Sequence, residues 1–172
     1  MAFKLYNAPQ STCSQRVRFV FNAKKLAFDE VKLNLLEGDQ LKPDYLKLNP
    51  NGVVPTLDHD GSIVNDSTVI TEYLDEVSQD VSFTPDTAFE RARMRALMHY
   101  IDEMPAASVR VPHCNLAFLP KCQSLTREAF VALAASKPRR QEFMMDRGTS
   151  GFPRTEVEAA QHALRRHCGP VR

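Results

Sequence analysis

The sequence lacks several features that would assign it to a specialised class of protein. No run of residues is long and apolar enough to span a bilayer, and residues 1–10, MAFKLYNAPQ, do not have the shape of a signal peptide. No C-x-x-C spacing occurs, and in a chain without an export signal scattered cysteines favour free thiols over a disulfide framework. The cysteines are Cys13, Cys114, Cys122 and Cys168. We therefore expect a cytoplasmic protein that does not insert into a membrane.

Charge of one sign is not in large excess either, because the formal net charge is only +1. The halves differ, however: residues 1–80 carry 8 Lys and Arg against 12 Asp and Glu, and residues 81–172 carry 14 against 9. This difference indicates two units that attract each other, a basic half that meets an anionic ligand, or simply a solvated surface of mixed charge. The arginines of 91–95 and 139–147 alternate with apolar residues, which favours a solvated or dimer face over nucleic-acid binding.

Hydrophobic residues make up 43% of the sequence, which is enough for a buried core without disulfides or metals. In the first half, alternation of period 2 and spacing of period 3.6 predict a compact βαβ-ββα module, with Asp60-Gly61 as the hairpin turn. A βαβ unit places its two strands parallel with a right-handed crossover. Strands are expected at 2–6, 29–35, 54–58 and 62–65, and helices at 14–25 and from Ser67, as N-cap, to Val77.

After Ser78 the pattern becomes helical throughout. Thr84 and Pro85 form a favoured helix start, with Thr84 as N-cap, and the apolar stripe that follows continues to Met104. Pro105 and Pro112 are expected to break or end this helix. Two further helical patterns cover 124–135 and 155–166. The sequence thus predicts an α/β domain at 1–79 and an all-α domain at 85–172.

Pro55 stands at the head of a stretch that otherwise has the pattern of a buried strand, in NGVVPTLDHDGSIVNDS (51–67). Proline removes a ladder donor and is normally confined to strand starts, edges and bulges. A cis Val54-Pro55 bond, which costs only about 0.5–1 kcal/mol relative to trans, would turn the N–H and C=O of Val54 outward. Those groups can pair with another extended backbone, so the sequence predicts a peptide ligand.

Asp66 and Ser67 open the helix that follows this strand pair. Free N–H groups and the helix dipole favour a carboxylate there, and Ser67 can donate through its hydroxyl. Asp66 offers a carboxylate to a positive group such as an α-amine. Alternatively Ser67 simply caps its helix and Asp66 is a surface residue, but together with Pro55 the pair favours a site for the amino-acid end of a short peptide.

The stretch VVPTLDHDGSIVNDSTVITEYL (53–74) resembles the V-P-x-L…D-G…[ED]-S-x-x-I…Y-L signature of cytosolic glutathione transferases. The resemblance covers residues 2 to about 110. It implies a thioredoxin-like N-terminal domain, a helical C-terminal domain, a homodimer with the 91–95 helix at its interface, and glutathione bound across Val54, Asp66 and Ser67 with Pro55 cis. By the same resemblance, Lys42 and Asn51 contact the glycyl end of glutathione or shape its approach.

The stretch STCSQRVR (11–18) is similar to the S-S-C-S-x-R-V-R motif of zeta-class transferases. It begins a helix, where positive potential stabilises a thiolate. Ser11 falls at the active-site position and is predicted to hydrogen-bond the glutathione sulfur, and Ser14, at the second cysteine position of a glutaredoxin, is counted among the glutathione contacts. Cys13 is the rival to Ser11 as a nucleophile, although packing of Cys13 between helix and sheet is favoured. Arg16 supports either the carboxylates or the helix.

The leading expectation is an enzyme that transfers the glutathione thiolate to a hydrophobic or aromatic electrophile, and two other functions remain open. NDSTVITEYLDEV and RARMRALMHYIDE are similar to bacterial transferases that cleave β-aryl ethers, in which the glutathione thiolate displaces a phenolate. The zeta resemblance implies instead a cis–trans isomerisation of maleylacetoacetate-like acids. A glutathione-binding module without turnover is the third. Electrophile-binding candidates are Tyr100, Met104, Val111 and Phe118.

The C-terminal end departs from the family pattern. The G-x-x-[ST]-x-A-D capping motif that opens a central helix in family members is not present, so we expect a shortened transferase. His162, His167 and Cys168 match no common zinc spacing, and we expect them to be solvated and no metal to be bound.

Overall fold

The computed structural model describes residues 2–78 and 82–167. The chain divides into two compact units, residues 1–95 and residues 96–172. The division falls inside helix α4 (Ala88–Glu103), whereas the change in sequence pattern at 79–85 marks the end of the preceding helix, α3. Each unit is described by itself below.

The first unit contains one four-stranded sheet of order β2-β1-β3-β4. Its strands are β1 (Phe3–Asn7), β2 (Asp29–Lys32), β3 (Thr56–His59) and β4 (Ser62–Asn65). Strand β1 is parallel to β2 and antiparallel to β3, and β4 is antiparallel to β3. The predicted βαβ-ββα order is therefore confirmed. Strand β2 is shorter than the predicted 29–35, because the Asn34 side chain accepts the Leu36 N–H at 3.1 Å and turns the chain there.

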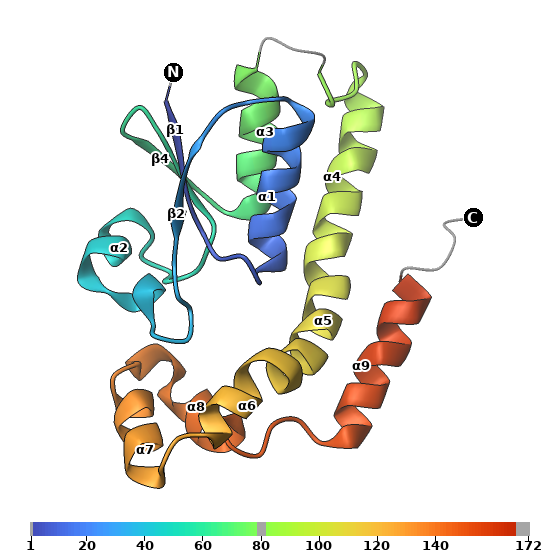
Figure 1. The fold of residues 1–172 in the computed structure, drawn as a ribbon. Coiled ribbons are helices and arrows are strands. Elements are labelled where there is room, and N and C mark those ends of the chain that lie inside the picture. The colour runs from blue at the N-terminus through green and yellow to red at the C-terminus, as the bar shows by residue number, and fades with distance from the viewer. Residues whose placement is uncertain (1, 79–81, 168–172) are drawn as a thin grey trace. The chain divides into compact units, whose positions relative to one another are not determined.

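Two amphipathic helices, α1 (Thr12–Ala23) and α3, lie side by side on one face of this sheet (Figure 1). Their apolar stripes and the inward residues of β1 and β3 form one buried cluster. Its members are Phe3, Leu5, Val17, Phe21, Leu57, Ile70 and Leu74. A short 3₁₀ turn, η1 (Asp39–Leu41), and helix α2 (Pro43–Leu48) lie on the other side of the sheet. The core therefore joins the sheet to both long helices.

A buried carboxylate, Asp75 of α3, binds the segment that follows this helix. It forms an ion pair with Lys24 at 2.5 Å. It also accepts hydrogen bonds from Ser82, Phe83 and Thr84. The prediction that Thr84 caps the next helix is wrong: its hydroxyl donates to Asp75, and Thr87 accepts the Glu90 N–H at 3.2 Å at the start of α4.

The described part of the second unit is helical. Its elements are α5 (Pro105–His113), a π-helical turn η2 (Cys114–Phe118), α6 (Leu119–Gln123), α7 (Arg127–Ala135), a 3₁₀ turn η3 (Pro138–Arg140), α8 (Gln141–Arg147) and α9 (Arg154–His167). Helices α5 and α9 pack along each other (Figure 1). Helix α4 ends before Pro105, as expected, but Pro112 lies inside α5 and does not end it. Two helical patterns are confirmed as α7 and α9, with Thr126 capping α7.

A hydrogen-bond clamp closes the second unit around Gly151. The Asn115 amide donates to the Phe152 carbonyl at 2.9 Å and accepts the Phe152 N–H at 2.8 Å. Gly151 has a φ of +68°, and a Cβ there would lie 2.7 Å from both Asn115 Oδ1 and Leu119 Cδ2. Only glycine fits this position. None of the described helices combines the length and the hydropathy that crossing a membrane requires.

Candidate functional site

The first feature of the candidate site is the backbone around Val54 and Pro55, where the sequence predicts a cis peptide bond. The Val54-Pro55 bond is cis. The preceding carbonyl, that of Val53, accepts hydrogen bonds from the Tyr45 hydroxyl at 2.6 Å and from the Asn49 amide at 2.9 Å. Among residues 2–78 and 82–167, in contrast, neither the N–H nor the C=O of Val54 has a hydrogen-bond partner. An extended backbone can therefore pair with this residue.

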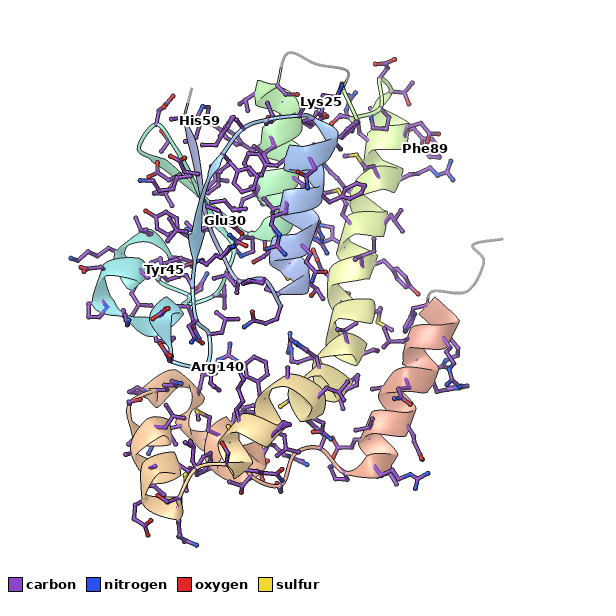
Figure 2. The ribbon with its side chains drawn as sticks, in the orientation of Figure 1. Lys25, Glu30, Tyr45, His59, Phe89 and Arg140 are labelled. Carbon is purple, nitrogen blue, oxygen red and sulfur yellow. The ribbon has the colours of Figure 1, made fainter. Side chains whose placement is uncertain are left out.

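A buried polar network, which the sequence pattern did not predict, holds the backbone on either side of the cis bond. Thr56 Oγ1 contacts the Tyr45 hydroxyl at 2.9 Å, accepts from Asn49 Nδ2 at 3.1 Å and donates to Asn65 Oδ1 at 2.7 Å. Figure 2 shows Tyr45 on the side of α2 that faces the sheet. Burial raises the pKa of Tyr45 above its ordinary value, so the hydroxyl remains a neutral donor. The available signal was the polar Thr56 directly after Pro55 at a position expected to be buried.

The start of α3 differs by one residue from the prediction. Asp66, not Ser67, is the N-cap: its Oδ1 accepts the Thr68 N–H at 2.8 Å and the Val69 N–H at 3.2 Å. Ser67 is the first helical residue and is buried. Asp66 is exposed and has a φ of +75°. The cap uses one carboxylate oxygen, so Oδ2 is available to a cation.

Arg16 connects the two helix starts. From α1 its Nη1 donates to Thr68 Oγ1 at 2.6 Å and lies 3.5 Å from Ser67 Oγ. The sequence left open whether Arg16 supports carboxylates or a helix, and the structure places its guanidinium at the first turn of α3. A positive charge there adds to the anion-binding potential of a helix N-terminus.

At the start of α1, Ser11 is the N-cap and its Oγ accepts the Ser14 N–H at 3.2 Å. Because the cap uses Ser11 only as an acceptor, its O–H can donate outward. Ser14 does not fit its expected place among the ligand contacts: it is fully buried, and its Oγ accepts the Ala8 N–H at 3.3 Å. Cys13 is partly exposed in the first turn of α1. The helix begins two residues before the predicted Ser14 because Ser11 caps it.

Lys42 and Asn51 lie at the ends of α2. Lys42 is exposed and pairs with Asp39 at 2.7 Å, a hydrogen bond that raises the pKa of the lysine and lowers that of the carboxyl. Asn51 is also exposed, and its N–H donates to Asn49 Oδ1 at 3.1 Å. Gly52 beside it has a φ of +61°, and a Cβ there would lie 2.7 Å from Leu41 Cδ2. The Lys42 ammonium and the Asn51 backbone are thus both held by local contacts.

The electrophile candidates belong to the second unit, where the structure does not bring all of them together. Tyr100 is exposed on α4 and its hydroxyl hydrogen-bonds His167 Nδ1. Met104 is one turn further along and is exposed. Phe118 lies in η2 with its ring edge against His113, at 5.6 Å between ring centroids, and Val111 is partly buried in α5.

The described ranges, 2–78 and 82–167, contain no group of three His, Cys, Asp or Glu side chains arranged to hold a metal ion. His162 is exposed on α9, and His167 is engaged with Tyr100. Cys168, the third residue considered in the sequence, lies outside the described residues.

The mixed sheet, the helix pair on one face and the cis-proline before β3 define the first unit as a thioredoxin-like domain. Residues 10–77 match the family model "Glutathione S-transferase, N-terminal domain". The first unit is therefore an N-terminal domain of the glutathione S-transferase family, as the sequence predicts.

Curated relatives agree with this assignment. Maleylacetoacetate isomerase of Dictyostelium discoideum is 37% identical over 111 residues, which cover 62% of this chain and 51% of the relative. Glutathione S-transferase Z1 of Arabidopsis thaliana is 36% identical over 116 residues, covering 67% of this chain and 50% of the relative. The chain thus spans about half the length of the curated relatives it matches.

Among solved structures, the beta-etherase LigF from Sphingobium sp. strain SYK-6 is similar to both units. It superposes with a TM-score of 0.81 at 28% identity, over 95% of this chain and 69% of LigF. The likeness confirms a thioredoxin-like domain followed by a helical part.

Proposed function

We propose that the first unit binds glutathione and that the chain transfers the glutathione thiolate to a hydrophobic or aromatic electrophile. The observation that carries the proposal is the unpaired backbone of Val54 in the same unit as two helix starts. The middle residue of glutathione pairs with Val54. The α-amine of the γ-glutamyl residue of glutathione binds Asp66. The α-carboxylate of the same residue binds Ser67 and the first turn of α3, next to Arg16. Lys42 and Asn51 meet the glycyl end.

Ser11 donates its hydroxyl to the glutathione sulfur in this proposal. The donor stabilises the thiolate, which attacks the carbon that bears an aryloxy group. A C–S bond forms, the C–O bond breaks with its electron pair on oxygen, and the phenolate takes up a proton from solvent. The proton lost when the thiol ionised also goes to solvent, so the reaction needs no oxidant or reductant. Tyr100, Met104 and Phe118 are proposed to contact the electrophile.

The second candidate is a glutathione-dependent cis–trans isomerisation. It is supported by the STCS stretch and by relatives named as maleylacetoacetate isomerase and zeta-class transferase. In this reaction the thiolate adds to a conjugated double bond, the resulting single bond rotates, and the thiolate is eliminated, so nothing is consumed. A panel that contains a β-aryl ether, an activated aryl halide and a cis-enone acid separates the two candidates.

A cytoplasmic homodimer completes the proposal. The helix that carries Arg91 to Arg95 exposes an apolar side chain on either side of these arginines, Phe89 (Figure 2) and Leu97. We expect sedimentation at micromolar concentration to give twice the mass of the chain, and a monomer that still binds glutathione would exclude this part of the proposal.

Calorimetric titration with glutathione tests the binding site. Ser67→Ala should weaken binding by about 1–3 kcal/mol, because a hydrogen bond to a carboxylate is lost. Ser136→Ala, at an exposed serine at the C-terminal end of α7, is the matched control and should bind as the unmodified chain does. Unchanged affinity in Ser67→Ala would leave this serine with a structural role only.

The thiolate assignment has its own test. Ser11→Ala should reduce the ultraviolet absorbance of bound thiolate at neutral pH and lower turnover, with little change in glutathione affinity. Cys13→Ala should have a smaller effect. If Cys13→Ala abolishes turnover and Ser11→Ala does not, a covalent cysteine mechanism replaces the one proposed. Binding without thiolate or turnover in the unmodified chain would make it a glutathione-binding module.

A further inference from the structure

The guanidinium of Arg18 reaches back from the second turn of α1 to the loop that connects β1 to this helix. Its Nη1 donates to the Asn7 side-chain oxygen and to the Ala8 carbonyl at 3.4 Å, and its Nη2 donates to the Pro9 carbonyl at 3.1 Å. Three successive residues of one loop are thus bonded to a single planar group. Lysine, with one compact ammonium, does not offer such a fork.

One of the two carbonyls that Arg18 binds, that of Ala8, takes part in the hydrogen bonds that place Ser11. The Ala8 carbonyl also accepts the Ser11 N–H at 3.1 Å. The Ala8 N–H donates to Ser14 Oγ, and the Ser14 N–H donates to Ser11 Oγ. These bonds form a closed set around the start of α1, so a shift of the Ala8 carbonyl moves the Ser11 hydroxyl.

The far partner of Arg18 is itself held firmly. Asn7 is fully buried at the end of β1. Its Nδ2 donates to Glu30 Oε1 at 3.2 Å and to the Leu5 carbonyl at 3.3 Å. Glu30 stands on β2 (Figure 2), so the chain of bonds runs from the sheet through Asn7 to the loop. Arg18 therefore ties the loop to the rigid part of the first unit and not merely to its own helix.

We infer that Arg18 is a positioning residue: through its guanidinium fork it sets the place of the Ser11 hydroxyl and hence the ionisation of the bound thiol. The thiol consequence rests on the proposed function, whereas the hold on the loop does not. Arg16, two residues earlier, contacts Ser67 and Thr68 of the other helix and is not part of this set. The two arginines of the STCSQRVR stretch thus have separate roles.

The test compares Arg18→Lys, which keeps the charge, with Arg18→Gln, which loses it. Arg154→Gln, at an exposed arginine of α9 paired only with Glu158, is the surface control. The first measurement is amide hydrogen exchange of Ser11 and Ser14 in the unliganded protein by NMR. Both Arg18 variants should exchange about tenfold faster at these amides, with the amides of β1 and β3 unchanged, and Arg154→Gln should not differ from the unmodified chain.

The second measurement is the pH titration of bound-glutathione thiolate by ultraviolet absorbance, with KM and kcat for an activated aryl halide. Both Arg18 variants should move the titration upward by about one pH unit and lower kcat at neutral pH, while KM for glutathione stays within about twofold. A residue that only stabilised the fold would lower the active fraction without moving the titration.

The outcomes are distinct. The inference is overturned if the amides of Ser11 and Ser14 exchange at unchanged rates in both variants. It is also overturned if Arg18→Lys behaves as the unmodified chain while Arg18→Gln is impaired, because charge alone would then matter. An unmoved thiolate titration beside a normal wild-type thiolate overturns the inference and leaves the proposed function standing. If exchange is faster in the variants but the unmodified protein forms no thiolate, the proposed function is overturned, whereas the contact of Arg18 with the loop is confirmed.

Discussion

The two units of the chain are stabilised in different ways. In the first, residues far apart in sequence form one continuous buried cluster between a sheet and two helices. In the described part of the second, the buried hydrophobic side chains are small or scattered: Cys122, Phe130, Ala134 and Ala160. Specific hydrogen bonds, such as the Asn115 clamp, determine the course of the chain there. A rigid platform can hold loops and helix starts in place, and all the backbone geometry of the candidate binding site lies in the first unit.

The largest expected effect tests whether that cluster is the main source of stability. Phe21→Ala should cost about 3–5 kcal/mol in the free energy of unfolding, since a fully buried ring leaves a cavity. Phe19→Ala, in the same helix at a residue that is 72% exposed, is the matched control and should change it little. Denaturant unfolding, with hydrogen exchange to assign the loss to the first unit, measures both. Equal costs for the two substitutions would mean that burial in this cluster is not the main source of the stability of the first unit.

The next effect concerns the segment bound by Asp75. Asp75→Asn should destabilise the first unit by about 3 kcal/mol, because Lys24 loses its buried carboxylate partner. Burial raises the pKa of Asp75, but hydrogen bonds from Lys24, Phe83 and Thr84 outweigh it and hold the pKa below the ordinary value. The unfolded chain therefore takes up the proton first as the pH falls.

It follows that the stabilisation by Asp75 is fully present above about pH 5 and declines as the pH falls below about 4. The difference between the unmodified chain and Asp75→Asn, measured by urea unfolding from pH 7 to pH 3, should shrink over that window. A difference that stayed constant down to pH 3 would contradict a lowered Asp75 pKa that contributes to stability.

A smaller effect is expected from the clamp in the second unit. Gly151→Ala should cost about 1–3 kcal/mol, because the new Cβ meets Asn115 and Leu119 in a left-handed backbone conformation. Gly61→Ala in the first unit is a control for the conformation alone: its φ is +89°, and nothing lies within 4 Å of a Cβ there. Thermal unfolding should show the larger loss for Gly151→Ala. If Gly61→Ala costs as much, close packing around Gly151 contributes nothing.

The smallest effect marks the edge of the candidate site. Lys42→Ala should leave stability unchanged and weaken glutathione binding by less than about fivefold, because exposed ion pairs contribute little and this lysine already pairs with Asp39. Lys47→Ala, an equally exposed lysine paired with Asp44 in the same helix, is the control. Calorimetry at low and moderate salt measures both variants, and a loss as large as that of Ser67→Ala would move Lys42 to the centre of the site.

Local patterns predicted much of the first unit. Alternation around β2, the Asp60-Gly61 turn and the apolar stripes of α1 and α3 indicated the correct order of elements, because each depends on neighbours within a few residues. Helix starts were displaced by one or two residues. Asp66 and Ser67 are both good caps, and only the folded backbone shows which one lies in the non-helical position. Thr84 was misassigned for a similar reason, since a distant carboxylate competes for its hydroxyl.

The sequence alone determined that the chain has a βαβ-ββα module with a cis-proline before its third strand, followed by helices, and it pointed to Ser11, Val54, Asp66 and Ser67. Only the tertiary structure decided which hydroxyls remain available. Ser11 and Ser14 are the same residue type in the same short stretch, but Ser11 is a partly exposed helix cap and Ser14 is buried against Ala8. The roles of Arg16 and Arg18 also depend on partners on other strands and helices. Hydrogen-bond partners distant in sequence are set by packing, which no local pattern encodes.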